Sequence, residues 1–229
     1  MKKQLILSAI AAVALGAPAA SMAESLDFNY KVDRFADIEV LRYKVPDFEQ
    51  LTIQQKELVY YLTEAALYGR DILTDQNGKY NLAIRTTLEN IYKNYDGSKD
   101  DADYKGFVLY LKQVWFANGI HHHYSTDKFT PQFSQAFFET QVKKLSKKQL
   151  PLKKGQTVDA FLKEITPVIF APTVMAKRVN QANGQDLILT SANNYYEGVT
   201  QAEVEQFYAA MKKTDNPEEP ISYGLNSRL

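Results

Sequence analysis

The sequence predicts a predominantly helical α+β fold with a few short strands. Apolar residues recur at helical steps through residues 58–72. Residues 28–32 instead alternate between apolar and polar side chains, as a strand does. Thr200 and Glu203 have the spacing of a capping box at the start of a helix. The chain of 229 residues is long enough for one domain or for a large part of one.

The elements follow from local patterns along the chain. Short strands are expected near residues 28–45, 186–190 and 221–229, and helices over 53–73, 82–95 and 103–117, from Thr130-Pro131, from Thr157 to Ile165 and from Thr200. The helix over 53–73 has apolar side chains on several faces, so it is expected to be the central and most buried element. The helix over 103–117 is expected to bury Trp115 and to end at a Gly119 cap. Pro167 is expected to make the following chain irregular.

Residues 1–23 have the features of a secretory signal peptide. Lys2 and Lys3 form a basic start, an apolar run follows from Leu5 to Ala17, and Ser21-Met22-Ala23 offers small residues for cleavage. The apolar run is too short to span a bilayer comfortably, so no stable membrane insertion is expected, although a retained anchor is the alternative. The mature chain, residues 24–229, is therefore expected in the periplasm.

Composition narrows the possible functions. The chain has 27 basic and 27 acidic side chains, so it has no overall charge that would attract nucleic acid. The lysine-rich stretch over residues 143–154 resembles a patch for anionic surfaces, but the balanced charge favours a solvated loop. Because the chain has no cysteine, it can have neither structural disulfides nor a catalytic thiol.

The segment Asn118-Gly-Ile-His-His-His-Tyr124 invites interpretation as a metal site. In an extended segment only His121 and His123 could converge, because neighbouring side chains point to opposite faces. With no other histidine and no cysteine, these side chains cannot complete a tetrahedral zinc site, and no metal ligand is predicted. Asn118, His121 and His123 remain candidates for hydrogen bonds to a substrate. The alternatives are a polar loop packed against the chain and a partial metal site.

No motif identifies a catalytic residue. The chain lacks the glycine-rich loops of nucleotide-binding enzymes and the Gly-x-Ser-x-Gly elbow of α/β-hydrolases. Tyr223, Asn226 and Arg228 lie on the last extended segment and are candidates for substrate binding. Arg228 is able to hold a carboxylate through two parallel hydrogen bonds, although an ordinary surface arginine is the alternative.

Several segments together resemble the dipeptidyl peptidase III family, and especially its secreted bacterial members. They are Tyr61-Leu-Thr-Glu-Ala-Ala-Leu-Tyr-Gly69, Phe107-Val-Leu-Tyr110, Asn118-Gly-Ile-His-His-His-Tyr124, Lys128-Phe-x-Pro131, Gly198-Val-Thr200 and Asn226-Ser-Arg-Leu229. They follow the order and rough spacing of that family across nearly all of the mature chain.

The resemblance implies a zinc exopeptidase that releases dipeptides from the N-termini of peptides. Members have two lobes around a wide cleft. The zinc lies in a helical upper lobe, on a His-Glu-x-x-x-His helix and on a second helix that supplies a glutamate. The lower lobe is a small β-barrel with helices, and its strands help to bind the peptide. This chain has neither zinc motif, so the resemblance implies that zinc belongs to the full-length enzyme and that this chain binds none.

The chain is therefore expected to be the N-terminal part of the lower lobe, with an incomplete β-barrel and no activity alone. Its expected partners are peptide substrates and the missing C-terminal part of the same enzyme. The chain stops at Arg228-Leu229 within a predicted strand, which also suggests a fragment. The alternative is an independent periplasmic binding or interaction module.

Overall fold

The structure is a computed structural model that describes residues 28–212 and 224–228. It confirms the predicted fold class, since most of its regular structure is helical and its one named sheet in these residues has two strands. The chain separates into two compact units, which divide at residue 53 and are described one at a time. The predicted signal peptide lies outside the described residues.

The first unit contains a β-hairpin. Strands β1 (Lys31–Phe35) and β2 (Ile38–Leu41) pair antiparallel, with Phe35 opposite Ile38. Ala36 makes the tight turn with a φ of 48°, in the left-handed region. A short 3-10 helix, η1 (Phe48–Gln50), follows. The strand prediction near residues 28–45 is thus confirmed.

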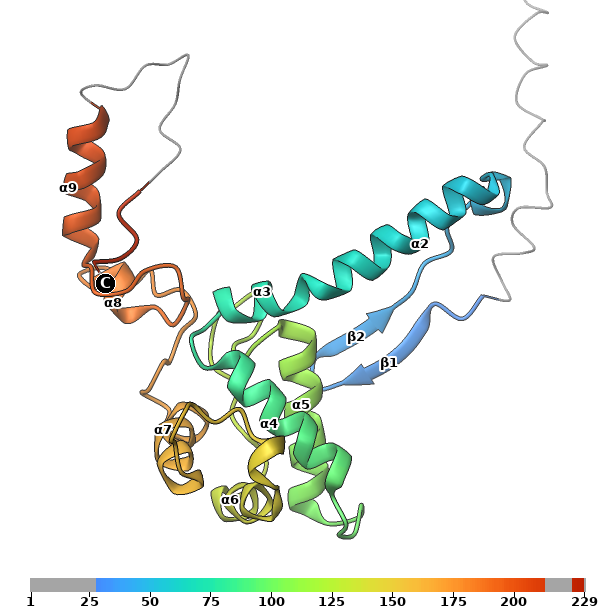
Figure 1. The fold of residues 1–229 in the computed structure, drawn as a ribbon, viewed down its shortest axis with the longest axis horizontal. Helices are drawn as coiled ribbons and strands as arrows, with labels where there is room; N and C mark the ends of the chain where they lie inside the picture. The colour runs from blue at the N-terminus through green and yellow to red at the C-terminus, as the bar shows by residue number, and fades with distance from the viewer. Residues whose placement is uncertain (1–27, 213–223, 229) are drawn as a thin grey trace, which may run out of the picture. The chain divides into compact units, whose positions relative to one another are not determined.

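All of the named elements of the second unit are helices (Figure 1). Its elements are α2 (Ile53–Tyr68, which begins at the unit boundary), α3 (Arg70–Gln76), α4 (Asn81–Asn94), α5 (Ala102–Ala117), α6 (Gln135–Lys144), η2 (Lys147–Gln149), α7 (Val158–Phe170), α8 (Leu187–Thr190) and α9 (Gln201–Lys212). Helices α4 and α5 match the helices predicted over 82–95 and 103–117 to within a residue at each end. Within the described part of the chain, no helix has both the length and the apolar character needed to cross a membrane.

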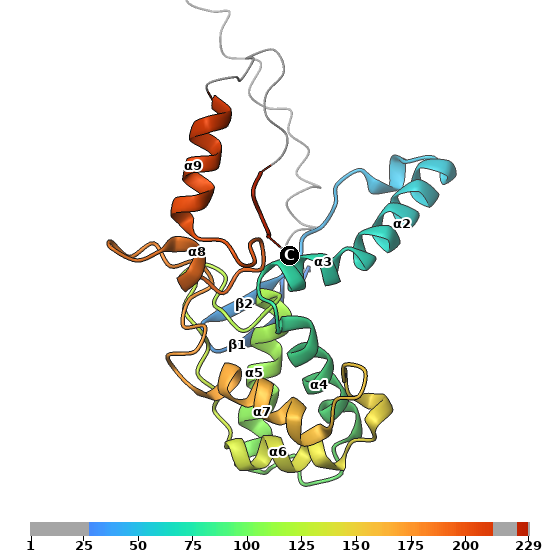
Figure 2. The same cartoon turned by 60° about the vertical axis from the view of Figure 1, so that its left-hand side comes forward.

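Helices α4 to α7 enclose the hydrophobic core. Figures 1 and 2 both show α4 beside α5, with α6 and α7 packed near one end of the pair. The core is rich in aromatic rings and includes Ile84, Leu88 and Ile91 of α4, Phe107, Tyr110, Leu111 and Val114 of α5, Phe133 and Phe138, and Phe161, Ile165 and Ile169 of α7. Phe133 contacts rings on both sides, since its centroid lies 5.7 Å from Phe107 and 5.4 Å from Phe170.

The expectation for residues 53–73 is wrong in two respects. The predicted single helix ends at Tyr68, and α3 begins at Arg70 after Gly69. No residue of α2 is buried, and the side chains of Leu58, Tyr61 and Leu62 are 58%, 66% and 61% exposed. Apolar side chains on several faces of a helix favour its burial, but the helix is buried only where other elements pack against those faces.

Helix α6 begins later than the Thr130-Pro131 dipeptide predicted. Ser134 is its N-cap, and its hydroxyl accepts a hydrogen bond from the backbone N–H of Phe137 at 3.1 Å. Asp103 of α5 fixes this cap, because its carboxylate accepts bonds from both the N–H and the hydroxyl of Ser134, each at 2.7 Å. The preceding loop lies so close to α5 that a Cβ atom added at Gly106 would be 1.8 Å from the carbonyl oxygen of Gln132.

Helix α7 starts at the predicted Thr157 cap but does not end before Pro167. The Thr157 hydroxyl accepts from the N–H of Ala160, and Pro167 lies inside the helix, which continues to Phe170. The end of this helix is held by Lys128, whose ammonium group donates to the carbonyl oxygens of Val168, Ala171 and Val174. Pro167 removes one helical bond, to the carbonyl of Lys163, and α7 nevertheless continues for three more residues to the end that Lys128 caps.

The strand predicted at residues 186–190 is instead the short helix α8. One carboxylate oxygen of Asp186 accepts bonds from the N–H groups of Ile188 and Leu189, each at 2.9 Å. The other oxygen accepts from the N–H of Gln201, the first residue of α9, at 3.0 Å. Asp186 therefore caps two helices at once. The predicted capping box of α9 is confirmed, since Glu203 accepts from the N–H of Thr200 at 2.8 Å and its own N–H donates to the Thr200 hydroxyl.

Candidate functional site

The loop after α5 is shaped by Asn118 rather than by the predicted Gly119 cap. Asn118 ends α5 in the left-handed conformation, with φ 52° and ψ 45°. The side-chain amide of Asn77 donates to the carbonyl oxygens of Ala117 and Asn118, at 3.4 and 3.2 Å. Because Asn77 is buried, these bonds fix the loop to the turn between α3 and α4.

The three histidines have different environments. His121 is buried, and its Nε2 is 2.7 Å from the carbonyl oxygen of Met175. Burial lowers the pKa of His121 to about 4, so the ring is neutral at physiological pH. His122 accepts bonds from the N–H groups of Tyr124 and Ser125 on its Nδ1. The ring of His123 packs edge-on against Phe116, with centroids 5.0 Å apart.

These histidines do not fit a zinc ion. One ring nitrogen of His121 is held by Met175, and the Nδ1 of His122 is held by two backbone N–H groups. Among the residues that the structure describes, no group of three or more His, Cys, Asp or Glu side chains is arranged to hold a metal ion. No step of a reaction is therefore assigned to a metal at this loop.

A pocket of about 640 Å³ lies next to this loop. Trp115, Phe116 and Asn118 line it from the end of α5, and Leu67, Arg70 and Arg85 line it from α2, α3 and α4. We call it the Trp115 pocket. The Trp115 and Phe116 side chains are 42% and 41% exposed, so two aromatic rings are available to a ligand. Tyr92 stacks edge-on against Trp115 at 6.0 Å.

Hydrogen bonds fix the polar wall of the Trp115 pocket. Arg85 donates to the Thr74 hydroxyl at 3.0 Å and pairs with Asp71 of α3, which joins α3 to α4. Glu89 accepts a bond of 2.9 Å from the indole N–H of Trp115, which orients the ring. Arg70 forms no ion pair with any other described residue and lines the same space. The pocket thus combines aromatic faces with two guanidinium groups and with the carboxylates of Asp71 and Glu89, a combination suited to the polar and apolar groups of a peptide.

Sequence reasoning found Asn118 and His123, which lie at or beside this pocket, but missed Trp115 and Arg70. Trp115 was expected in the core because it is aromatic and follows Val114. The buried stripe of α5 runs through Phe107, Tyr110, Leu111 and Val114, and positions 115 and 116 fall outside it. The available signal was that two large aromatic residues lie between the stripe positions Val114 and Ala117.

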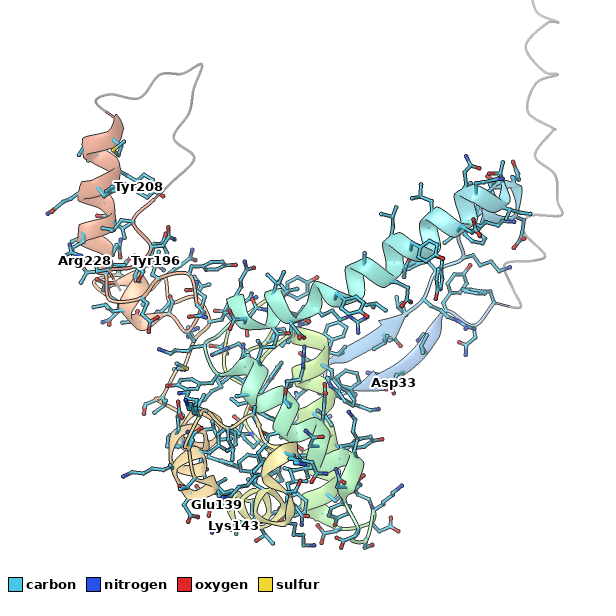
Figure 3. The ribbon with its side chains drawn as sticks, in the orientation of Figure 1. Asp33, Glu139, Lys143, Tyr196, Tyr208 and Arg228 are labelled. Atoms are coloured by element: carbon cyan, nitrogen blue, oxygen red, sulfur yellow. The ribbon has the colours of Figure 1, made fainter. Side chains whose placement is uncertain are left out.

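The candidates near the C-terminus lie beside α9. The backbone carbonyl of Asn226 accepts from the N–H of Glu197 at 2.9 Å, and its side-chain amide donates to the carbonyl of Tyr195. Arg228 pairs with Glu203 at 2.9 Å, and Figure 3 shows it at the base of α9 near Tyr196. The guanidinium therefore binds a carboxylate of this chain. Tyr223 lies outside the described residues.

The turn between α3 and α4 connects both groups of candidates. On one side Asn77 binds the Asn118 loop and accepts a bond from Arg178. On the other side the Gln76 carbonyl accepts from the N–H of Asn194 at 2.9 Å. Lys79 pairs with Glu197 at 2.7 Å, and Glu197 in turn bonds Asn226. A continuous set of contacts thus links residues distant in sequence.

Comparison with known protein families finds no matching family model, and no curated protein matches the chain.

Proposed function

We propose that the chain is the N-terminal part of the lower lobe of a secreted, dipeptidyl peptidase III-like zinc exopeptidase. The whole enzyme would release dipeptides from the N-termini of peptides in the periplasm. Its zinc ion and general base would come from the remainder of the enzyme, because this chain has neither zinc motif. The role of this chain is to form one wall of the peptide cleft.

The exposed surface of α2 supports this proposal most directly. The helix is 16 residues long and rich in Leu and Tyr, and none of its residues is buried. Large exposed apolar surfaces are typical of contact sites for further protein. A lower lobe that continues into the rest of an enzyme needs such a surface.

The proposal gives the candidate residues different roles. Asn118 and Trp115 would contact peptide directly, since both line the Trp115 pocket. His123 would act through Phe116, against which its ring packs. Arg228 would have to exchange Glu203 for a substrate carboxylate. His121 would have to leave its bond to Met175, so we assign it a structural contribution.

The test is expression of the natural gene with all of the coding sequence that follows residue 229. The expected product contains a His-Glu-x-x-x-His segment, binds zinc and releases dipeptides from a dipeptidyl reporter substrate. Trp115→Ala in that protein should raise KM for the peptide more than it lowers kcat, whereas an exposed control, Tyr43→Ala, should change neither. A frame that stops directly after residue 229 would overturn the proposal.

The Trp115 pocket also favours a second candidate, an independent periplasmic binding module. The chain has one tryptophan, so its fluorescence reports this pocket alone. The purified chain would be titrated with short peptides that carry a free carboxylate. Saturable quenching by the isolated chain that is lost in Arg70→Gln would support the binding module. Unchanged fluorescence would count against it.

A further inference from the structure

The sequence contains three asparagine–glycine pairs, and the structure places them in very different environments. They are Asn77-Gly78, Asn118-Gly119 and Asn183-Gly184. Glycine after asparagine permits a specific reaction, because the missing Cβ allows the following backbone nitrogen to approach the asparagine side chain. Local sequence is therefore equally permissive at all three sites, and any difference between them comes from the fold.

The first two pairs are held in place. Asn77 is buried, and its amide group donates to Ala117 and Asn118 and accepts from Arg178. The backbone N–H of Gly78 donates to the Asp75 carbonyl at 3.1 Å. The N–H of Gly119 donates to the Val114 carbonyl, also at 3.1 Å. Both glycine nitrogens are thus occupied, and their backbones are fixed by neighbouring helices.

The third pair lies in an open turn ahead of α8. Asn183 and Gly184 are both exposed. Gly184 has a φ of 77°, and a Cβ added there would have no heavy atom within 4 Å. Within the described part of the chain, the N–H of Gly184 donates no backbone hydrogen bond. Two hydrogen bonds shape the turn without using the Gly184 nitrogen: the N–H of Gln185 donates to the Ala182 carbonyl, and the N–H of Ala182 donates to the Asn180 side chain, each at 3.2 Å.

We propose that Asn183 is a site of spontaneous deamidation, with water as the only co-reactant. The backbone nitrogen of Gly184 attacks Cγ of Asn183, and a new N–Cγ bond closes a five-membered succinimide. The Cγ–Nδ2 bond breaks, and the amide leaves as ammonia with the proton lost by the Gly184 nitrogen. Water then opens the ring at either carbonyl carbon, which gives aspartate or isoaspartate. Either product adds a negative charge three residues before Asp186.

The modification affects the helices α8 and α9 through Asp186. That carboxylate caps both α8 and α9. Isoaspartate lengthens the backbone by one methylene within the turn that leads to this cap. A second nearby carboxylate also repels the Asp186 charge. In the deamidated chain the Asp186 carboxylate should therefore cap α8 and α9 less strongly than in the unmodified chain.

The experiment compares the three pairs within one molecule. The purified chain is incubated at mildly alkaline pH, once folded and once in concentrated urea, and its peptides are mapped by mass spectrometry with fragmentation that distinguishes isoaspartate. In the folded chain Asn183 should react at least about tenfold faster than Asn77 or Asn118, because the latter two must first open locally. In urea the three rates should converge.

Asn183→Gln provides the matched variant, because it keeps the amide but lengthens the side chain and disfavours ring closure. It should abolish product in this peptide and leave the slow reaction at Asn77 and Asn118 unchanged. Equal rates at the three sites in the folded chain would overturn the proposal. The proposal would also be overturned if urea accelerated deamidation at Asn183 by the same factor as at Asn77 and Asn118.

Discussion

The ammonium group of Lys128 donates a hydrogen bond of 2.6 Å to the carbonyl oxygen of Val174. The same group bonds the carbonyls of Val168 and Ala171 at the end of α7. Burial lowers the pKa of Lys128 from its usual value, but its contacts are those that a charged ammonium favours. A cation at this position also complements the negative end of the helix dipole. The side chain of Lys128 thus caps the end of α7, although it lies 40 residues before Val168 in the sequence.

Replacing this cap should destabilise the fold. Lys128→Met keeps roughly the length of the side chain but removes the ammonium donor from three carbonyl oxygens, of which that of Ala171 still accepts from the N–H of Val174. It should cost about 2–3 kcal/mol in the free energy of unfolding. Lys177→Met is the matched control, because Lys177 makes an exposed ion pair with Asp127 and should cost below about 1 kcal/mol. Urea denaturation followed by circular dichroism measures both. Equal effects would show that Lys128 is not a cap.

The close approach at Gly106 predicts an intolerance of any side chain. Gly106→Ala places a methyl group 1.8 Å from the Gln132 carbonyl, so α5 and the loop before α6 must separate. The expected loss is about 3 kcal/mol or more. Gly69→Ala is the control, since its nearest contact is 3.3 Å from Ala66 and the site is otherwise open. Thermal unfolding of the two variants should differ clearly, and a Gly106→Ala chain as stable as Gly69→Ala would contradict the packing.

The buried His121 predicts a loss of stability in acid. The pKa of this ring is about 4 in the folded chain and 6.5 for an unperturbed histidine, so the unfolded chain takes up its proton first. Stability from neutral His121 is complete above pH 6.5 and is lost as the pH falls from 6.5 to about 4. The loss should reach about 3 kcal/mol.

The check is to measure the free energy of unfolding against pH for the natural chain and for His121→Asn. Carboxylates titrate in both chains, so the difference between the two curves isolates His121. That difference should fall steadily across the interval. Parallel curves would mean that the pKa of His121 is the same in the folded and unfolded chains.

The proposed function predicts that the chain alone has no peptidase activity. Residues 24–229 should release no dipeptide from an N-terminal dipeptidyl reporter substrate, with or without added zinc, because His121 and His122 are held by other bonds. The protein expressed together with the coding sequence that follows residue 229 is assayed alongside it. Turnover by the short chain that depends on zinc and disappears in a His121→Ala, His123→Ala variant would refute the prediction.

The fold could be predicted best where local and tertiary signals agree. Helices α4 and α5 were found because their apolar stripes match the surface that the core buries. The α8 segment was mistaken for a strand because Leu187-Ile-Leu-Thr190 favours extended structure, whereas the two-helix cap at Asp186 depends on Gln201, 15 residues away. Pro167 was expected to break a helix that Lys128, also remote in sequence, helps to hold.

The candidate site was predictable only in part for the same reason. Asn118 stood out because it lies at a helix exit beside three histidines and its amide can form hydrogen bonds. Its left-handed conformation was not predicted, since Gly119 was expected to be the cap. Arg70 carries no such local mark, and it becomes notable only when α3, α4 and α5 pack together around the Trp115 pocket. Packing of the helices brings these residues together, and no periodic pattern in the sequence marks them.

Helix α2 has a consequence for how assembly can be observed. A helix of 16 residues without a buried side chain is held mainly by its own backbone hydrogen bonds, and such helices are marginal in water. Its amide hydrogens should exchange with solvent far sooner than those of α5, and a protease should cut there first. Anything that covers α2 would slow both processes. The rates of amide exchange and proteolysis in α2 therefore report whether another protein segment covers this helix.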